Sequence, residues 1–163
     1  MRSEHEREFA DFFDRASPRL LSAAWMLAGD QHTAEDLAQE ALARTYARWS
    51  RVRGGQPLAY ARRTLVNLHT DRWRKHRREV LTDAAPEGLV ADPQAASHLD
   101  LVRALATLSP RERECVVLRH YLDLSEKQTA ETLGISVGSV KNYTMHGLRG
   151  LRARLLEGED SHA

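Results

Sequence analysis

The 163-residue sequence has little cysteine, few aromatic residues and no long apolar run. Its one cysteine, Cys115, excludes an intramolecular disulfide and a cysteine-rich zinc site, and its apolar neighbours predict that it is buried. No apolar run approaches the roughly 20 residues of a membrane-spanning helix, and the acidic N-terminus is unlike a signal peptide. These features predict a cytoplasmic protein without a membrane span.

The sequence also lacks the patterns of a catalytic or cofactor site. Its eight histidines do not occur with carboxylates or the cysteine at metal-ligand spacing, and the HEXXH motif is absent. The segments GDQHT and RGGQP match neither nucleotide-binding glycine loop, and Ser17, Ser50 and Ser109 fit helix caps or ends rather than nucleophile elbows. We therefore predict no catalytic residue, no metal, no cofactor and no enzymatic activity.

Positive charge is concentrated in one segment, although the formal net charge is only +1. From Arg62 to Glu79, seven Lys or Arg residues stand against two carboxylates. A basic stripe interleaved with Tyr60 and Trp73 favours nucleic acid over a membrane as its partner, because a wide apolar face is missing. A solvated basic helix end is the alternative interpretation.

Helical periodicity and the lack of any strand pattern predict an all-α protein with two small helical domains. The N-terminal domain would span residues 1–79 and the C-terminal domain residues 98–157. Residues 80–97 contain prolines, a glycine and acidic residues but no Lys or Arg, which predicts an acidic flexible linker. Residues 158–163 would form a disordered tail.

Three helices are expected in the N-terminal domain. Ser17-Pro18 either starts a new helix or kinks a long first one. The second helix would be capped by Thr33 and end near Trp49, and a loop over residues 51–57 would precede the amphipathic third helix.

A helix-turn-helix is predicted at the end of the C-terminal domain. Ser125 and Gln128 have the spacing of a capping box, as do Ser109 and Glu112 further upstream. Gly134 stands where a helix commonly ends in a left-handed residue, and the serine two residues later can cap the next helix. On that second helix, we expect an apolar face of Val140, Leu148, Leu151 and Leu155.

Longer motifs in this order resemble the extracytoplasmic-function sigma factors of bacterial RNA polymerase. TAEDLAQEALARTYARW is similar to their AEDLVQE-type helix, and PLAYARRTLVNLHTDRWRKHRR to the promoter-reading helix that follows it. The segment from LSPRERECVV to MHGLRGLR resembles their C-terminal DNA-reading domain. The resemblance covers residues 7–156. It implies an alternative sigma factor that binds RNA polymerase core and directs promoter recognition and transcription initiation.

The resemblance also implies protein partners. By position, Asp36, Gln39 and Glu40 match residues that dock on the clamp coiled coil of the polymerase's largest subunit. A hydrophobic surface around Leu118 and Leu122 would receive the flap of the second-largest subunit. An anti-sigma factor is a further candidate partner.

The first domain is expected to act on the minus-ten element of the promoter. Asn67 matches an asparagine that lies near a flipped-out base in the family, and the Arg53–Leu58 loop matches the specificity loop that completes that pocket. An amide can read the Watson–Crick edge of an unstacked base. Arg53, the first residue of that loop, is also expected to bind the minus-ten DNA. The residues expected to hold the DNA backbone are arginines: Arg62, Arg63, Arg72, Arg74 and Arg77.

The second domain is expected to read the minus-thirty-five element. The matching positions on the recognition helix are Ser139, Lys141, Asn142, Met145 and His146. The sequence departs here from the common pattern VKSRLHRALRRLR, because an arginine is often found where His146 stands. Without that arginine a bidentate contact to guanine is missing, so the base preference of relatives does not transfer.

A stand-alone helix-turn-helix regulator is the alternative interpretation, because response-regulator output domains also place this motif after an SPRE-like segment. Such a regulator would bind duplex operators, as a dimer, without polymerase. The AEDLAQE helix and the basic helix after it would then have no task, which favours the sigma factor.

Overall fold

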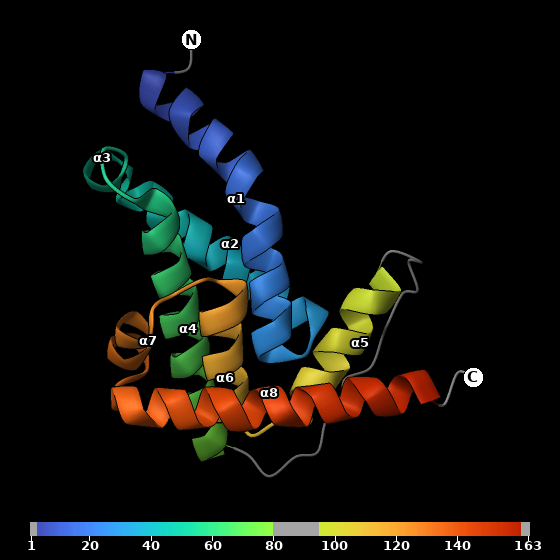
Figure 1. Cartoon of the computed structure of the whole chain (residues 1–163). Coiled ribbons are helices and arrows are strands. Elements are labelled where there is room, and N and C mark those ends of the chain that lie inside the picture. The colour runs from blue at the N-terminus through green and yellow to red at the C-terminus, as the bar shows by residue number, and fades with distance from the viewer. Residues whose placement is uncertain (1–2, 80–94, 161–163) are drawn as a thin grey trace. The chain divides into compact units, whose positions relative to one another are not determined.

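The computed structural model describes residues 3–79 and 95–160, without the side chains of residues 76–79, 95–97 and 159–160. The described residues form helices and no strand, so the predicted all-α fold is confirmed (Figure 1). They divide into two compact units, residues 3–79 and 95–160, each with its own buried core. None of the helices in these ranges combines the length and apolar character that a membrane crossing requires.

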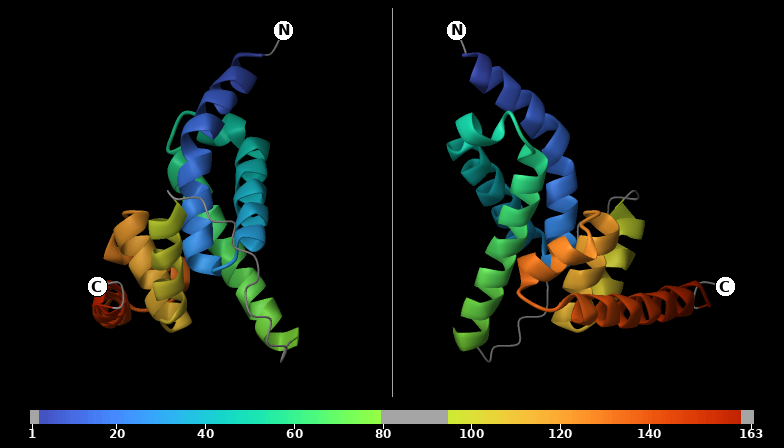
Figure 2. Two further views of the ribbon diagram at one scale, coloured as in Figure 1. Left: turned by 90° about the vertical axis from the view of Figure 1, so that its right-hand side faces the viewer. Right: turned by 60° about the vertical axis from the view of Figure 1, so that its left-hand side comes forward.

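The first unit packs three long helices around one core. These helices are α1 (Glu4–Ala28), α2 (Gln31–Ala47) and α4 (Pro57–Glu79), with the short α3 (Trp49–Val52) before α4. α1 and α2 pack against each other and against α4, whose buried hydrophobic residues lie in its first half, between Ala61 and Leu68. α4 extends past the ends of both partners (Figure 2). The core is made of fully buried aliphatic side chains, among them Leu20, Leu27, Leu37, Leu65 and Val66.

α1 is one continuous helix with Pro18 inside it, so the sequence alternative of a second helix start at this proline does not occur. A capping box begins α1, since Ser3 and Glu6 exchange side-chain-to-backbone hydrogen bonds of 3.3 Å each. Gly29 ends it at φ +76°, and its N–H donates to the Trp25 carbonyl at 2.8 Å.

The expected cap of the second helix is wrong by three residues. Asp30, not Thr33, caps α2, because its carboxylate accepts the Thr33 backbone N–H at 2.9 Å and the Thr33 hydroxyl at 2.6 Å. Both bonds hold the pKa of Asp30 below its ordinary value, the hydroxyl bond more than the backbone bond. Thr33 is therefore the donor to the cap rather than the cap itself.

A short helix also lies where the sequence predicts the start of a loop. α3 extends from Trp49 to Val52, although the loop is expected from residue 51. Trp49 is buried and packs its ring against Phe9 and Phe12 of α1, with ring centroids 5.2 and 5.3 Å apart. Burial of this indole against α1 turns the chain back toward the core and supports the extra helical turn.

The second unit contains four α-helices and a π-helical turn. They are α5 (Ala95–Ala106), α6 (Pro110–Val116), the π-turn η1 (Val117–Tyr121), α7 (Glu126–Leu133) and α8 (Val137–Asp160). α5 begins three residues before the expected domain start at 98. α8 continues through residues 158–160, where the sequence predicts a disordered tail. The remaining residues of the predicted linker and tail, 80–94 and 161–163, lie outside the described residues.

Several expected helix ends in this unit are confirmed. Ser109 and Glu112 form a capping box at α6, with bonds of 3.2 and 3.3 Å. Ser125 and Gln128 form another at α7, with bonds of 2.9 and 3.0 Å. Gly134 ends α7 in the left-handed region, at φ +68°. Cys115 is fully buried as predicted, and burial raises its pKa to about 11.

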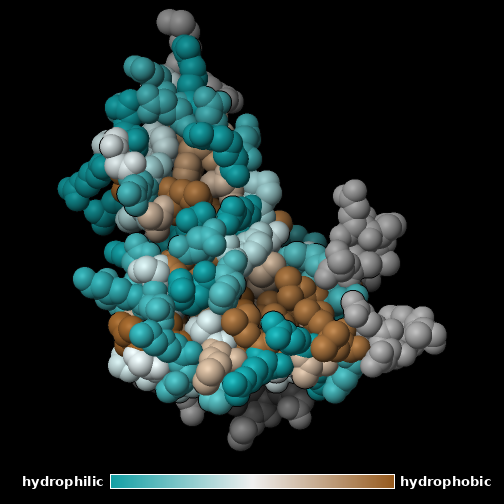
Figure 3. Space-filling view, viewed as in Figure 1, coloured by the Kyte–Doolittle hydropathy of each residue, from teal (hydrophilic) through white to brown (hydrophobic). Residues whose placement is uncertain are grey.

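The packed face of α8 differs from the predicted one. Val140 is fully buried, but Leu148 and Leu155 are 37% and 40% exposed. The buried side continues instead through Gly147, where α8 comes very close to α6. Figure 3 shows hydrophobic residues at the surface near α5 and the C-terminal half of α8. The helix is thus rotated so that part of its leucine stripe faces solvent.

Gly147 is the residue that permits this close approach. A Cβ at this position would lie 2.6 Å from Val116 Cγ2 and 3.1 Å from the Glu112 carbonyl oxygen. Neither atom can move easily, because one belongs to a buried β-branched side chain and the other to the backbone of α6. The sequence carries no signal that distinguishes this glycine from others of the helix.

We therefore expect Gly147→Ala to lower the free energy of unfolding by about 1–3 kcal/mol through overpacking. Gly138→Ala is the matched control on the same helix, because a Cβ there would make only an ordinary contact, 3.9 Å from Ser136 Oγ. The control should be neutral or stabilising by up to about 1 kcal/mol. Urea denaturation followed by circular dichroism measures both variants, and equal stability of the two would contradict the packing account.

Asp30→Ala should lower the free energy of unfolding by about 0.5–2 kcal/mol at pH 7, because it removes the cap of α2. The pKa of Asp30 is lower in the folded chain than in the unfolded chain. Its ionised carboxylate therefore stabilises the fold at pH values above the ordinary pKa of aspartate, and this stabilisation is lost as the pH falls through the folded pKa. The difference between wild type and variant should therefore shrink at pH 2–3. Denaturation at both pH values tests this; a difference that does not depend on pH would contradict it.

Candidate nucleic-acid and protein-binding surfaces

The outward face of α8 presents most of the predicted minus-thirty-five residues. Lys141, Asn142, Met145 and His146 are all exposed. Ser139 behaves differently, since its N–H donates to Ser136 Oγ at 3.0 Å and its hydroxyl lies 2.9 Å from the same oxygen. The structure therefore brings four of the five residues together on one exposed face and uses the fifth in the helix cap.

Two arginines next to this face were missed by the sequence analysis. Arg149 and Arg152 line a hollow of about 410 Å³ beside Lys141 and Met145, together with Arg119 of η1. Their spacing of eight and eleven residues from Lys141 returns them to the same side of a helix. That spacing is the signal that could have found them.

The predicted minus-ten residues on α4 occupy two sides of the helix. Helical geometry puts Arg63, Asn67 and Arg74 within about 40° of one another, and all three are exposed. Arg62 and Arg72 each lie about 140° from Asn67 around the helix axis. Arg62 is half-buried, whereas Arg72 is exposed, like the other residues from 71 to 75. Of these five residues, Arg63, Asn67 and Arg74 share one exposed side of α4.

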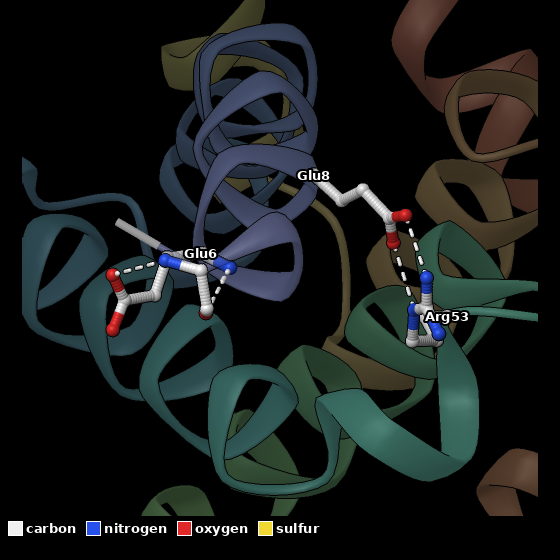
Figure 4. A network of polar contacts seen from close by, with 4 residues as sticks. Glu6, Glu8 and Arg53 are labelled. Carbon is white, nitrogen blue, oxygen red and sulfur yellow. Dashed lines mark hydrogen bonds and ion pairs between the residues drawn. The ribbon is translucent and has the colours of Figure 1, made fainter. Parts of the chain in front are cut away.

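The remaining two arginines have separate positions. Arg53 follows α3 and forms a two-bond ion pair with Glu8 of α1, at 2.6 and 2.8 Å (Figure 4). Hydrogen bonding to Arg53 lowers the pKa of Glu8. Arg53 is thus bonded to a carboxylate of its own chain. Arg77 lies on α4, but its side chain is outside the described part of the chain.

The acidic face of α2 lies opposite its packing face. Asp36 and Gln39 are exposed and Glu40 is half-buried, whereas Leu37 is fully buried. Glu40 accepts a hydrogen bond from Arg44 at 2.9 Å, one helical turn later. Asp36 Oδ2 lies 3.8 Å from His32 Nε2, also one helical turn away. The structure therefore groups the three predicted docking residues on one side of α2, and both carboxylates have a local neighbour.

Leu118 and Leu122 do not form the predicted hydrophobic docking surface of the second unit. Leu118 and Leu122 are both fully buried. Around them the chain follows the π-turn, in which the Leu122 N–H donates to the Val117 carbonyl at 3.0 Å and the Leu124 N–H to the Leu118 carbonyl at 2.9 Å. The wider turn rotates both leucines into the core, so they offer no surface to a partner.

Comparison with known proteins identifies both units. A family model described as Sigma-70 region 2 matches residues 12–79, and one described as Sigma-70, region 4 matches residues 98–151. The two models occur in the order that the sequence motifs suggest, and they cover most of the described residues.

Curated relatives match along nearly the whole chain. The RNA polymerase sigma-E factor of Streptomyces coelicolor is 38% identical over 153 residues, which cover 91% of this chain and 86% of that protein. The ECF RNA polymerase sigma factor SigW of Bacillus subtilis is 29% identical over 165 residues, covering 90% and 88% of the two chains.

Solved structures share the fold. The sigma factor RpoE of Bartonella quintana, in a complex with the anti-sigma factor NepR, matches with a TM-score of 0.74 at 24% identity, covering 91% of this chain and 97% of that chain. CnrH, in a complex with the cytosolic domain of CnrY, matches with a TM-score of 0.62 at 20% identity, covering 94% and 90%.

The family models and the relatives thus agree with the family that the sequence motifs suggest. Nothing among these comparisons favours a stand-alone regulator. The chain belongs to the extracytoplasmic-function sigma factors, the alternative sigma factors that direct bacterial RNA polymerase to promoters for transcription initiation.

Proposed function

We propose that three helix faces divide the work of initiation in this sigma factor. The acidic face of α2 docks on a basic surface of the polymerase core, the clamp coiled coil of its largest subunit. The exposed face of α4 captures the opened minus-ten element, and the outward face of α8 reads the minus-thirty-five element. The observation that carries this proposal is that each helix buries its opposite face and presents residues of the required chemistry.

Docking through α2 is supported by charge and exposure. Asp36 and Gln39 are exposed on a helix whose other side is held against α1 and α4. Exposed carboxylates attract a basic partner most strongly at low ionic strength, because salt screens charges at the surface. Binding to the core should therefore weaken as salt rises.

Strand capture by α4 is supported by the group of Arg63, Asn67 and Arg74 on one exposed side. The Asn67 amide can donate to and accept from the edge of an unstacked base, while the guanidinium groups hold neighbouring phosphates. Unpairing one base costs a few kcal/mol, and these contacts offset that cost without ATP. Arg62 and Arg72, on another side of α4, would contact a different stretch of the DNA backbone.

Readout by α8 is supported by a polar face with one apolar side chain. Lys141 can contact guanine, Asn142 adenine and Met145 the methyl group of thymine in the major groove. Arg149 and Arg152 extend this face with two cations that suit phosphate oxygens.

The chain carries out no chemistry itself in this proposal, because RNA synthesis belongs to the polymerase. It works in the cytoplasm, where the polymerase and the chromosome are. RpoE and CnrH are bound by NepR and by the cytosolic domain of CnrY. We include an anti-sigma factor among the partners of this chain by analogy with these two proteins.

Asn67→Ala should weaken promoter opening by about 1–3 kcal/mol, because the amide no longer reads the flipped base. Binding to the polymerase core should not change. Permanganate reactivity of unpaired thymines measures opening, and Ser50→Ala on α3 is the control for removing an exposed polar group. Equal losses in opening and core binding would exclude this role of Asn67.

Asp36→Arg should abolish core association, because it puts a positive charge on the surface that meets the basic clamp. Asp14→Arg makes the same charge change on exposed α1 and should bind core like wild type. Equilibrium binding of labelled sigma factor to core, at two salt concentrations, measures both. Unchanged binding of the Asp36 variant would remove α2 as the docking face.

A further inference from the structure

The outward face of α8 carries an exposed sulfur-containing side chain, Met145. This side chain is 43% exposed. The common family pattern VKSRLHRALRRLR has a histidine at this position, so the thioether is a departure of this chain. A thioether differs from an imidazole in one respect that matters here, because oxidants convert it reversibly to a sulfoxide.

The other sulfur atoms in the described part of the chain are protected by burial. Met26 is only 4% exposed in the core of the first unit, and Cys115 is fully buried in the second unit. Burial also raises the pKa of the Cys115 thiol to about 11, so the thiol is protonated at neutral pH and is a poor nucleophile. Oxidation follows the exposure of the sulfur. Among the described residues, Met145 is therefore the sulfur side chain most open to an oxidant.

The surroundings of Met145 are strongly basic. It lines the hollow of about 410 Å³ to which η1, α7 and α8 contribute. The charged residues of this hollow are four cations and one carboxylate: Arg119, Lys141, Arg149, Arg152 and Glu126. Lys141 and Arg149 stand one helical turn before and after Met145, and side chains at this spacing are neighbours on a helix surface. An oxygen added to the sulfur would therefore meet hydrogen-bond donors on both sides.

Sulfoxide formation would change two contacts of the reading face. Reduced Met145 is apolar and suits the methyl group of thymine, whereas a sulfoxide is polar and accepts hydrogen bonds. The sulfoxide oxygen would accept from Lys141 or Arg149, and these cations would then be less available to base and phosphate oxygens. Both changes weaken the binding of α8 to DNA.

We propose that Met145 is a site of reversible oxidation by peroxide, and that its sulfoxide lowers the affinity of α8 for the minus-thirty-five element. The effect on DNA rests on the proposed function, whereas the oxidation itself does not. Met145 thereby couples the oxidant level to promoter binding through a residue that the fold leaves exposed.

The reaction is balanced with hydrogen peroxide as the oxidant. A lone pair of the Met145 sulfur attacks one peroxide oxygen, and the S–O bond forms as the O–O bond breaks. The departing hydroxide takes up the proton that remains on the transferred oxygen and leaves as water. The sulfur loses two electrons and the peroxide gains them. Methionine sulfoxide reductases reverse the step, since two thiols become a disulfide and the oxygen leaves as water.

The test oxidises the sigma factor alone. The full chain is treated with hydrogen peroxide, catalase removes the peroxide, and the chain is then combined with untreated polymerase core. Peptide mass spectrometry follows the uptake of oxygen at Met145 and Met26. The affinity of the holoenzyme for a duplex promoter fragment with a minus-thirty-five element is measured before and after treatment.

Two variants assign the effect to one sulfur. Met145→Leu replaces the exposed thioether by an apolar side chain of similar volume, and Met26→Leu makes the same change in the core. Each variant is compared with its own untreated sample, so a change in starting affinity does not enter the result.

Met145 should gain one oxygen on the order of ten times faster than Met26, because exposure governs the rate. Treatment should lower the duplex affinity about tenfold in wild type and in Met26→Leu, a loss comparable with one mismatched base pair. It should leave Met145→Leu at its untreated affinity. Methionine sulfoxide reductases should restore the affinity of the oxidised wild type.

The contrary outcomes are distinguishable. Equal oxidation rates at Met145 and Met26 would reject the site. Complete oxidation of Met145 with unchanged duplex affinity would reject its effect on DNA, yet the proposed function would stand if Lys141→Ala weakened the untreated complex. Equal losses in wild type and Met145→Leu would assign the sensitive group to another residue. An untreated Lys141→Ala complex as tight as wild type would reject readout by α8 itself.

Discussion

The contact of α8 with α6 at Gly147 determines what the second unit can present to DNA. Because Gly147 has no side chain, α8 comes close to α6, with Val140 and Gly147 buried on its inner side. The opposite side, with Lys141, Asn142 and Met145, must then face solvent, because successive helical residues turn by about 100°. The face of α8 that we propose reads DNA therefore depends on a packing contact on the opposite side of the helix.

In the first unit too, the buried face of each helix determines which residues are exposed. Small and branched apolar residues hold α2 and the first half of α4 against α1, and charged residues occupy the sides that remain exposed. The second half of α4 extends beyond these contacts, so its described arginines are exposed to solvent. The ion pair of Glu8 with Arg53 links α1 to the loop before α4, which makes Arg53 a part of that loop's support.

Local rules explain what could be predicted from the sequence. The capping boxes at Ser109 and Ser125 depend on residues three positions apart, and both are found. The cap of α2, which is predicted at Thr33 but formed by Asp30, shows the limit of such rules, because a threonine and an aspartate can both act as an N-cap. The pair of Glu8 and Arg53, the buried leucines of η1 and the rotation of α8 depend on contacts between distant residues, and no local pattern encodes them. Family resemblance supplied the surfaces on α2 and α4, whereas Arg149 and Arg152 could have been found from their helical spacing relative to Lys141.

Transcription by polymerase core supplemented with this chain tests the central claim most directly. Core and chain are incubated with fragments of the source genome, and the 5′ ends of the transcripts are mapped. The account predicts start sites that core alone does not use, preceded by shared minus-ten and minus-thirty-five elements. Tight binding of the chain to duplex DNA by itself, with no start site gained by the core, would contradict it.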